Sequence, residues 1–172
     1  MLIGNTMPEC SDWRRPYIAG LVDNRAAVAV TIAKRSEIKI GFGVRLKCRI
    51  KLPAAESLEI LTTFADEHDI VYRVDTDRDT TYDSYQFVIS RRQSMQTFLR
   101  LLQPYLVVRD EAAELLCETI IPRLEAGDHQ SKASFLSLMQ DIETFRELVG
   151  RANRAKYDLE FFQDEWGMEA PS

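Results

Sequence analysis

The sequence holds few of the residues from which metal sites and disulfide frameworks are built. It has 172 residues but only 3 cysteines and 2 histidines. Cys10, Cys48 and Cys117 are far apart and form no Cys-x-x-Cys pair, and His68 and His129 stand alone. Zinc sites draw their ligands mainly from clustered cysteines and histidines. The composition therefore excludes a zinc enzyme and a disulfide-stapled domain.

Long hydrophobic runs are absent as well. No apolar stretch approaches the ~20 residues that a membrane helix needs. Charged residues interrupt the first 16 positions, which is unlike a secretory signal. With 45% hydrophobic and 28% charged residues over a length typical of one domain, the chain can bury a core. We expect a soluble, cytoplasmic protein without a membrane partner.

Charge is distributed unevenly along the chain. The formal net charge is −5, but residues 13–55 carry ten basic and two acidic side chains, and residues 84–109 carry four basic ones and no acid. Residues 110–172 carry six basic and fourteen acidic side chains. A polyanion responds to the local field and not to the total charge. The two basic segments are therefore candidates for a surface that faces an anion such as nucleic acid.

The clearest local pattern lies in residues 44–52 (VRLKCRIKL), where apolar and basic residues alternate over nine positions. A period of two predicts a strand with one buried and one exposed face. The exposed face would carry Arg45, Lys47, Arg49 and Lys51 in a row. Because like charges on neighbouring positions repel each other, a plain solvated strand usually mixes the signs. We interpret the row as facing DNA; a solvated outer surface is the alternative.

The remaining pattern predicts an α+β domain with the element order αββαββα. The expected helices and strands lie at residues 13–22 (helix), 27–33 and 44–52 (strands), 53–68 (helix), 70–74 and 85–90 (strands) and 94–103 (helix). Together they make a four-stranded antiparallel sheet with one basic, DNA-facing side and helices on the other. Additional C-terminal helices and an acidic, aromatic tail follow. The expected division is an N-terminal arm (1–12), a main domain (13–127) and a C-terminal helical extension with the tail (128–172).

Residues 17–26 (YIAGLVDNRA) stand at the end of the first expected helix, directly before the first strand. They resemble the LAGLIDADG motif of homing endonucleases. The αββαββα order and the strands with DNA-facing cations fit that family, and so does the segment Gln103-Pro104-Tyr105-Leu106, which is followed by a basic residue, Arg109. The resemblance covers about residues 12–125 and implies the LAGLIDADG fold.

The resemblance also implies a homodimer, because the chain holds one copy of the motif. In the family, two motif helices pack against each other across a two-fold axis, where small residues permit a close approach. The expected interface consists of Tyr17, Ala19, Gly20, Leu21 and Asp23. The two sheets would lie over the major groove of a roughly palindromic duplex. The residues expected to contact DNA are Thr31, Arg35, Arg45, Lys47, Arg49, Lys51 and Arg109.

The motif differs from that of the family at the positions that carry the chemistry of DNA cleavage. Its eighth position, which holds the metal-binding acid in the family, is Arg25, and the position expected to be polar and to hold water is Leu52. A guanidinium repels a divalent cation, so no metal site and no catalytic residue are assigned. Asp23 is the remaining acid of the motif, and a structural hydrogen-bonding role suits it better than catalysis.

The leading hypothesis is therefore a DNA-binding protein with this endonuclease scaffold, whose cleavage is lost or impaired and which needs no cofactor. Three alternatives stay open. The first is an active endonuclease that uses Mg²⁺ and displaced acids. The second is an RNA-binding intron maturase, because the RNA backbone attracts cationic side chains as the DNA backbone does. The third is a protein–protein adaptor that has kept only the fold.

Overall fold

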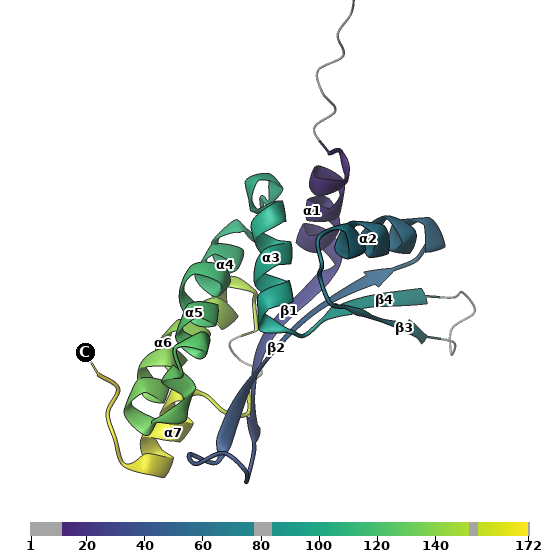
Figure 1. The fold of residues 1–172 in the computed structure, drawn as a ribbon. Helices are drawn as coiled ribbons and strands as arrows, with labels where there is room; N and C mark the ends of the chain where they lie inside the picture. Colours follow the sequence, from purple (N-terminus) through teal and green to yellow (C-terminus); the bar gives the residue numbers. More distant parts are fainter. Residues whose placement is uncertain (1–11, 78–83, 152–154, 172) are drawn as a thin grey trace, which may run out of the picture.

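The computed structural model describes residues 12–77, 84–151 and 155–171 (Figure 1). The first seven elements follow the predicted order: α1 (Arg14–Arg25), β1 (Ala26–Lys34), β2 (Phe42–Leu52), α2 (Ala55–Glu67), β3 (Arg73–Asp77), β4 (Ser84–Ile89) and α3 (Arg92–Leu102). They are followed by η1 (Gln103–Tyr105), α4 (Asp110–Leu115), η2 (Leu116–Ile120), α5 (Ile121–Glu125), η3 (Asp128–Gln130), α6 (Lys132–Leu148) and α7 (Leu159–Trp166). None of the helices in the described ranges is long and apolar enough to span a membrane.

The four strands form one antiparallel sheet in the order β1-β2-β4-β3. The strand predicted over residues 44–52 is confirmed and begins two positions earlier, at Phe42. Its apolar positions point into the protein: Leu46, Cys48 and Ile50 are at most 4% exposed. Successive side chains of a strand point to opposite faces, so the basic residues between them share the outer face.

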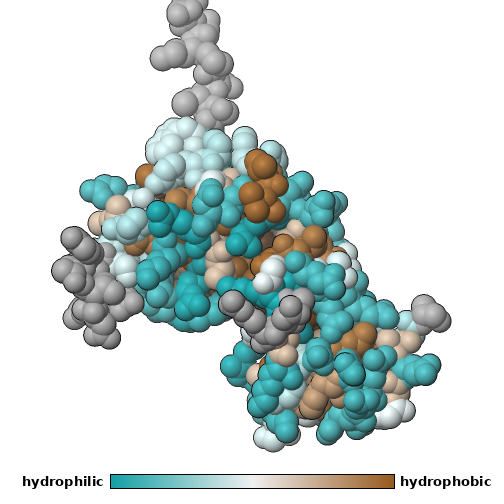
Figure 2. Space-filling view, turned by 180° about the vertical axis from the view of Figure 1, so that it is seen from behind, coloured by the Kyte–Doolittle hydropathy of each residue, from teal (hydrophilic) through white to brown (hydrophobic). Residues whose placement is uncertain are grey.

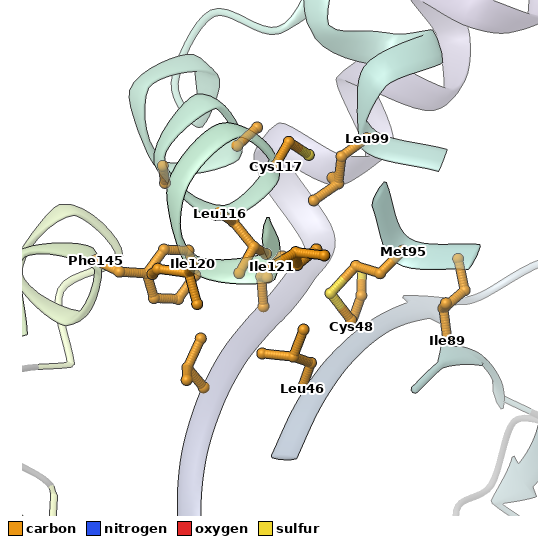
Figure 3. Close-up of a cluster of buried hydrophobic side chains, with 14 of the residues drawn as sticks. Leu46, Cys48, Ile89, Met95, Leu99, Leu116, Cys117, Ile120, Ile121 and Phe145 are labelled. Carbon is orange, nitrogen blue, oxygen red and sulfur yellow. The ribbon is translucent and has the colours of Figure 1, made fainter. Parts of the chain in front are cut away.

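Helices cover one face of the sheet and leave the other face open (Figure 1). The covered face meets the helices in a cluster of buried side chains that point toward one another: Leu46, Cys48, Ile89, Met95, Leu99, Leu116, Cys117, Ile120, Ile121 and Phe145 (Figure 3). Burial raises the pKa of the Cys48 thiol to about 12, so this cysteine is a protonated core residue. The α+β prediction, with helices on one side of a four-stranded sheet, is confirmed.

The aromatic tail docks on the beginning of β2. Phe42 makes edge-to-face contacts with Tyr157, Phe162 and Trp166, at ring-centroid distances of 5.3, 4.9 and 6.3 Å. Such pairs add to the stabilisation from apolar burial, and Phe162 is fully buried. The hydrophobic cluster therefore runs across the boundary expected between residues 127 and 128.

The third strand lies further along the chain than predicted. Residues 70–74 were expected to form it, but β3 spans Arg73–Asp77. The backbone N–H of Ile70 donates to the Ala65 carbonyl (2.9 Å), and that of Val71 donates to the Ser94 hydroxyl (3.0 Å). These two hydrogen bonds hold residues 70 and 71 against the end of α2 and the start of α3. The chain therefore pairs with β4 only from Arg73 onward.

Candidate nucleic-acid interface

The open face of the sheet carries a row of four basic side chains, all from β2. Arg45, Lys47, Arg49 and Lys51 alternate with the buried positions of the strand. Within the described parts of the chain, none of the four forms an ion pair. Cations that no carboxylate engages can neutralise phosphates or donate to base edges. We call these four residues the basic row.

Short side chains of β1 flank the basic row on the same face. The register gives three of the cations a small partner, in the pairs Ala27–Arg49, Ala29–Lys47 and Thr31–Arg45. Thr31 is exposed, and its hydroxyl donates to the backbone carbonyl of Arg45 (3.4 Å). Thr31 therefore lies beside the basic row, on the surface where it was expected.

An ion pair lies on β3, toward the far edge of the sheet. Arg73 donates from Nε to Oδ1 of Asp75 (3.0 Å) and from Nη2 to Oδ2 (3.1 Å). These hydrogen bonds lower the pKa of the Asp75 carboxyl, and the nearby charges of Lys47 and Arg49 lower it further. The positive field of the basic row thus reaches across the sheet. This pair was missed because the strand was expected to end at residue 74.

Arg35 lies at the hairpin that joins β1 to β2. Its side chain is 41% exposed, and its Nε forms an ion pair with Glu37 at 3.3 Å. Its backbone N–H donates to the Gly41 carbonyl (2.8 Å). Gly41 has a φ of 80°, a backbone conformation that glycine adopts without strain. Arg35 therefore extends the cationic surface to the tip of the hairpin, with an acid beside it.

Asp23, near the end of α1, binds a loop that is more than eighty residues away in sequence. Its carboxylate accepts hydrogen bonds from the backbone N–H groups of Val107 (2.9 Å), Val108 (3.2 Å) and Arg109 (3.0 Å). These donors precede α4 and have no partner within a helix. Asp23 thus holds the α3–α4 connection against α1, as its expected structural role requires.

Arg109 takes a different place from the one expected. Its Nε donates to the carbonyl of Val22 (3.1 Å) and its Nη2 to that of Ala26 (2.9 Å). The guanidinium therefore spans the junction between α1 and β1 and does not join the basic row. These two hydrogen bonds satisfy carbonyl groups at the end of α1, and contact of Arg109 with DNA stays a prediction.

Replacing Asp23 by alanine is expected to destabilise the fold. The substitution leaves three backbone N–H groups without their acceptor, and we expect the free energy of unfolding to fall by about 2–3 kcal/mol. Urea unfolding followed by circular dichroism measures it. Asp164→Ala, at an exposed position of α7, is the control and should change stability by less than about 0.5 kcal/mol. Equal effects of the two substitutions would refute the structural role of Asp23.

The end of α1 does not fit a divalent cation. Both Asp23 oxygens accept backbone hydrogen bonds, the Asn24 amide donates to the Gly20 carbonyl (2.8 Å), and Arg25 is an exposed cation. Leu52, at the position expected to hold water, is fully buried. A hard cation such as Mg²⁺ needs oxygen ligands that are free to coordinate it. In the described residues, no group of three or more potential ligands could hold a metal ion.

One side of α1 exposes an apolar strip. Trp13 is 54% exposed and Tyr17 38%, and a Cβ built on Gly20 meets nothing within 4 Å. The positions 13, 17 and 20 recur at helical spacing and so lie on one side of the helix. Ala19 was expected in the same interface but is fully buried in the core, and Asp23 is engaged by the loop before α4. Of the expected interface residues, Tyr17 and Gly20 lie on the outward side of the helix, and the interface itself stays a prediction.

Sequence reasoning missed the apolar residues that adjoin this strip. Tyr105 is 39% exposed, Val107 83% and Val108 72%. Asp23 holds their loop against α1. We call Trp13, Tyr17, Gly20, Tyr105, Val107 and Val108 the α1 surface. Figure 2 shows hydrophobic atoms in the upper part of the molecule, where Figure 1 places α1. The two consecutive valines after Leu106 were the sequence signal that could have revealed this exposed apolar surface.

Comparisons of the sequence give no relative. No protein-family model matches the chain, and no curated protein matches it. Solved structures do match, among them homing endonucleases. The chain thus has a fold that homing endonucleases share. More specifically, the fold is that of the LAGLIDADG homing endonucleases, as the resemblance of residues 17–26 predicted.

Three solved structures illustrate the match. The homing endonuclease I-CvuI, in complex with its target, has a TM-score of 0.71 and 18% identity, with 91% of this chain and 96% of that chain covered. The archaeal intron-encoded I-Vdi141I, complexed with DNA, has a TM-score of 0.69 and 18% identity, with 92% and 99% covered. The LAGLIDADG meganuclease I-CpaMI, bound to uncleaved DNA, has a TM-score of 0.66 and 16% identity, with 92% and 53% covered. This chain therefore corresponds to a whole I-CvuI or I-Vdi141I chain but to about half of I-CpaMI.

Proposed function

We propose that this protein binds double-stranded DNA as a homodimer, through the open face of its sheet, and that it does not cleave the DNA. The basic row carries this proposal: four cations on one strand, without an ion pair in the described part of the chain. The major groove, where base edges are accessible, admits a two-stranded β-ribbon, and β1 and β2 form such a ribbon with the basic row on it. The I-CvuI and I-Vdi141I structures, which share the fold, are complexes with DNA.

The α1 surface supports a two-fold dimer. I-CpaMI is about twice as long as this chain's match to it, so one chain of that protein spans two units of the present size. A protein with a single unit obtains the second from another copy. The exposed aromatic residues Trp13 and Tyr17 supply apolar contact area, and the space above Gly20 admits the backbone of a second helix.

Replacing Gly20 by leucine is expected to convert the dimer to a monomer. The side chain has room in the single chain but would hold two α1 helices apart. Leucine also favours a helix more than glycine does, so the stability of the monomer should not fall. Sedimentation velocity at micromolar concentration measures the mass, and Thr144→Leu, at an exposed position of α6, is the control. A monomeric wild type, or a Gly20→Leu variant that stays dimeric, would contradict this interface.

Absence of cleavage is proposed from the groups at the end of α1. Hydrolysis of a phosphodiester requires an activated water and stabilisation of the leaving oxygen, which carboxylate-bound metal ions supply in two-metal sites. Here the outward group is the Arg25 guanidinium, and both oxygens of the nearby Asp23 carboxylate accept backbone hydrogen bonds. A guanidinium binds phosphate but cannot ligate a metal ion. The arrangement therefore favours binding of the DNA backbone over its hydrolysis.

A competition experiment tests the partner class. A labelled duplex of random sequence is bound in a mobility-shift assay and challenged with unlabelled duplex DNA or with structured RNA of equal length. Duplex DNA should displace the label at concentrations at least tenfold lower than RNA. Displacement by RNA at lower concentrations would replace the proposal by an RNA-binding function, such as assistance to intron splicing. Absence of any shift would show that the protein does not bind the duplex, so that only the fold assignment would remain.

A further inference from the structure

We propose that Arg45 and Arg49 read guanines that lie about two to four base pairs apart in each half of the DNA site, an inference that rests on the proposed DNA binding. The basic row presents hydrogen-bond donors only, because neither arginine nor lysine has an acceptor. In the major groove, guanine offers two neighbouring acceptors, N7 and O6, whereas adenine offers one acceptor and one donor. A row made of donors therefore discriminates in favour of guanine.

The two arginines differ from the two lysines in how strongly they discriminate. The guanidinium is a planar fork whose two N–H groups match N7 and O6 together, whereas an ammonium group acts as a point charge that also suits a phosphate. Arg45 and Arg49 are both exposed. We therefore assign base reading to the arginines and general attraction of the duplex to Lys47 and Lys51.

The spacing follows from the geometry of the strand. Residues on one face of β2 recur every two positions, which corresponds to ~6.6–6.8 Å. Base pairs recur every ~3.4 Å along the duplex. The major groove is inclined to the duplex axis, so each base pair takes a longer path along the groove than along the axis. Neighbouring members of the basic row thus span about one to two base pairs, and Arg45 and Arg49 about two to four. In a two-fold dimer the second copy reads the other strand, so the guanines of one half-site become cytosines in the other half.

The neighbours of Arg49 keep its guanidinium available. Its partners across the sheet are Ala27 on β1 and Val88 on β4, neither of which can accept a hydrogen bond from it. Val88 lies between Arg49 and Arg73 in the register and is 1% exposed. The nearby carboxylate of Asp75 is held by Arg73 through both oxygens. The alanines of β1 bring methyl groups to the same face. These methyl groups can contact thymine methyl groups but form no hydrogen bonds with bases.

The test is a selection of duplexes from a randomised pool by the full-length protein. Wild type should enrich two guanines at one fixed spacing of about two to four base pairs, repeated in inverted orientation. A single guanine-to-adenine change should weaken binding about tenfold or more. Arg49→Ala should remove the preference at one of the two positions and Arg45→Ala at the other, so that the same base change then alters affinity by less than about twofold.

Lys39→Ala, in the hairpin between β1 and β2, is the matched control and should leave every base preference unchanged. Base preferences that persist in Arg45→Ala and Arg49→Ala, with a uniform loss of affinity, would overturn the base-reading assignment and leave DNA binding standing. No enrichment together with no binding to any duplex would instead overturn the proposed function itself.

Discussion

Simultaneous replacement of Arg45, Lys47, Arg49 and Lys51 by serine will remove most of the affinity for duplex DNA. Each phosphate that a protein neutralises contributes close to one unit to the slope of log affinity against log salt concentration. Because a dimer loses eight cations, of which at least the four lysines face phosphates, the slope should fall by about three units or more. Filter binding at several salt concentrations measures both quantities.

The quadruple variant should still fold, because the opposite face of β2 carries the core. Leu46, Cys48 and Ile50 remain buried beneath it. A matched control separates position from total charge: Arg45→Ser/Lys47→Ser is compared with Arg100→Ser/Lys132→Ser, which removes two charges from exposed sites on α3 and α6. Only the first pair should weaken binding strongly. Unchanged affinity in a folded quadruple variant would show that DNA does not contact this face.

Replacement of Arg25 by aspartate should create an affinity for Mg²⁺ that the wild type lacks. In the proposed dimer, the resemblance of residues 17–26 to the LAGLIDADG motif implies that the two side chains at position 25 lie near each other and near the DNA. Two guanidinium groups there repel a divalent cation, whereas two carboxylates attract it, and a weakly solvated site strengthens both effects. Titration calorimetry should detect binding of Mg²⁺ only to the variant, and weak metal-dependent nicking of plasmid DNA would accompany it.

Arg25→Asp is best tested alone before the other motif positions are restored. Arg25 is exposed, so the fold should tolerate the change, at a cost of less than about 1 kcal/mol for an acid at a helix C-terminus. Ala26 and Leu52 are buried at 6% and 0% exposure, and Leu52→Gln would place an amide in the core. If the wild type itself cuts plasmid DNA with Mg²⁺ and Asp23→Asn abolishes the cutting, then Asp23 holds the metal ion and the protein is a working endonuclease.

The sequence predicted those features that depend on local pattern. Alternation along residues 44–52 predicted both the strand and its basic face, since a strand repeats every two residues regardless of its surroundings. The motif at residues 17–26 led to the fold because its small residues and position before a strand are themselves local. The alternation alone places the four basic side chains on one face of β2.

The features that escaped prediction are those fixed by distant contacts. Arg109 was expected on the DNA surface, but its partners Val22 and Ala26 lie more than eighty positions away. Ala19 was expected at the interface because small residues permit close packing, yet the helix orientation turns it into the core while Gly20 faces outward. The orientation of α1 is set by its packing on the sheet, which periodicity over one short, weakly amphipathic helix does not specify.

The most direct test of DNA binding without cleavage is one titration read in two ways. A labelled random duplex is incubated with increasing protein, with and without Mg²⁺, at about 50 and about 200 mM salt, and bound fraction and strand integrity are measured on the same samples. With the four lysines of the basic row on phosphates in a dimer, affinity should fall about a hundredfold or more between the two salt concentrations, and the strands should stay intact at every protein concentration. Strands cut in the presence of Mg²⁺, or no binding even at low salt, would contradict the proposal of DNA binding without cleavage.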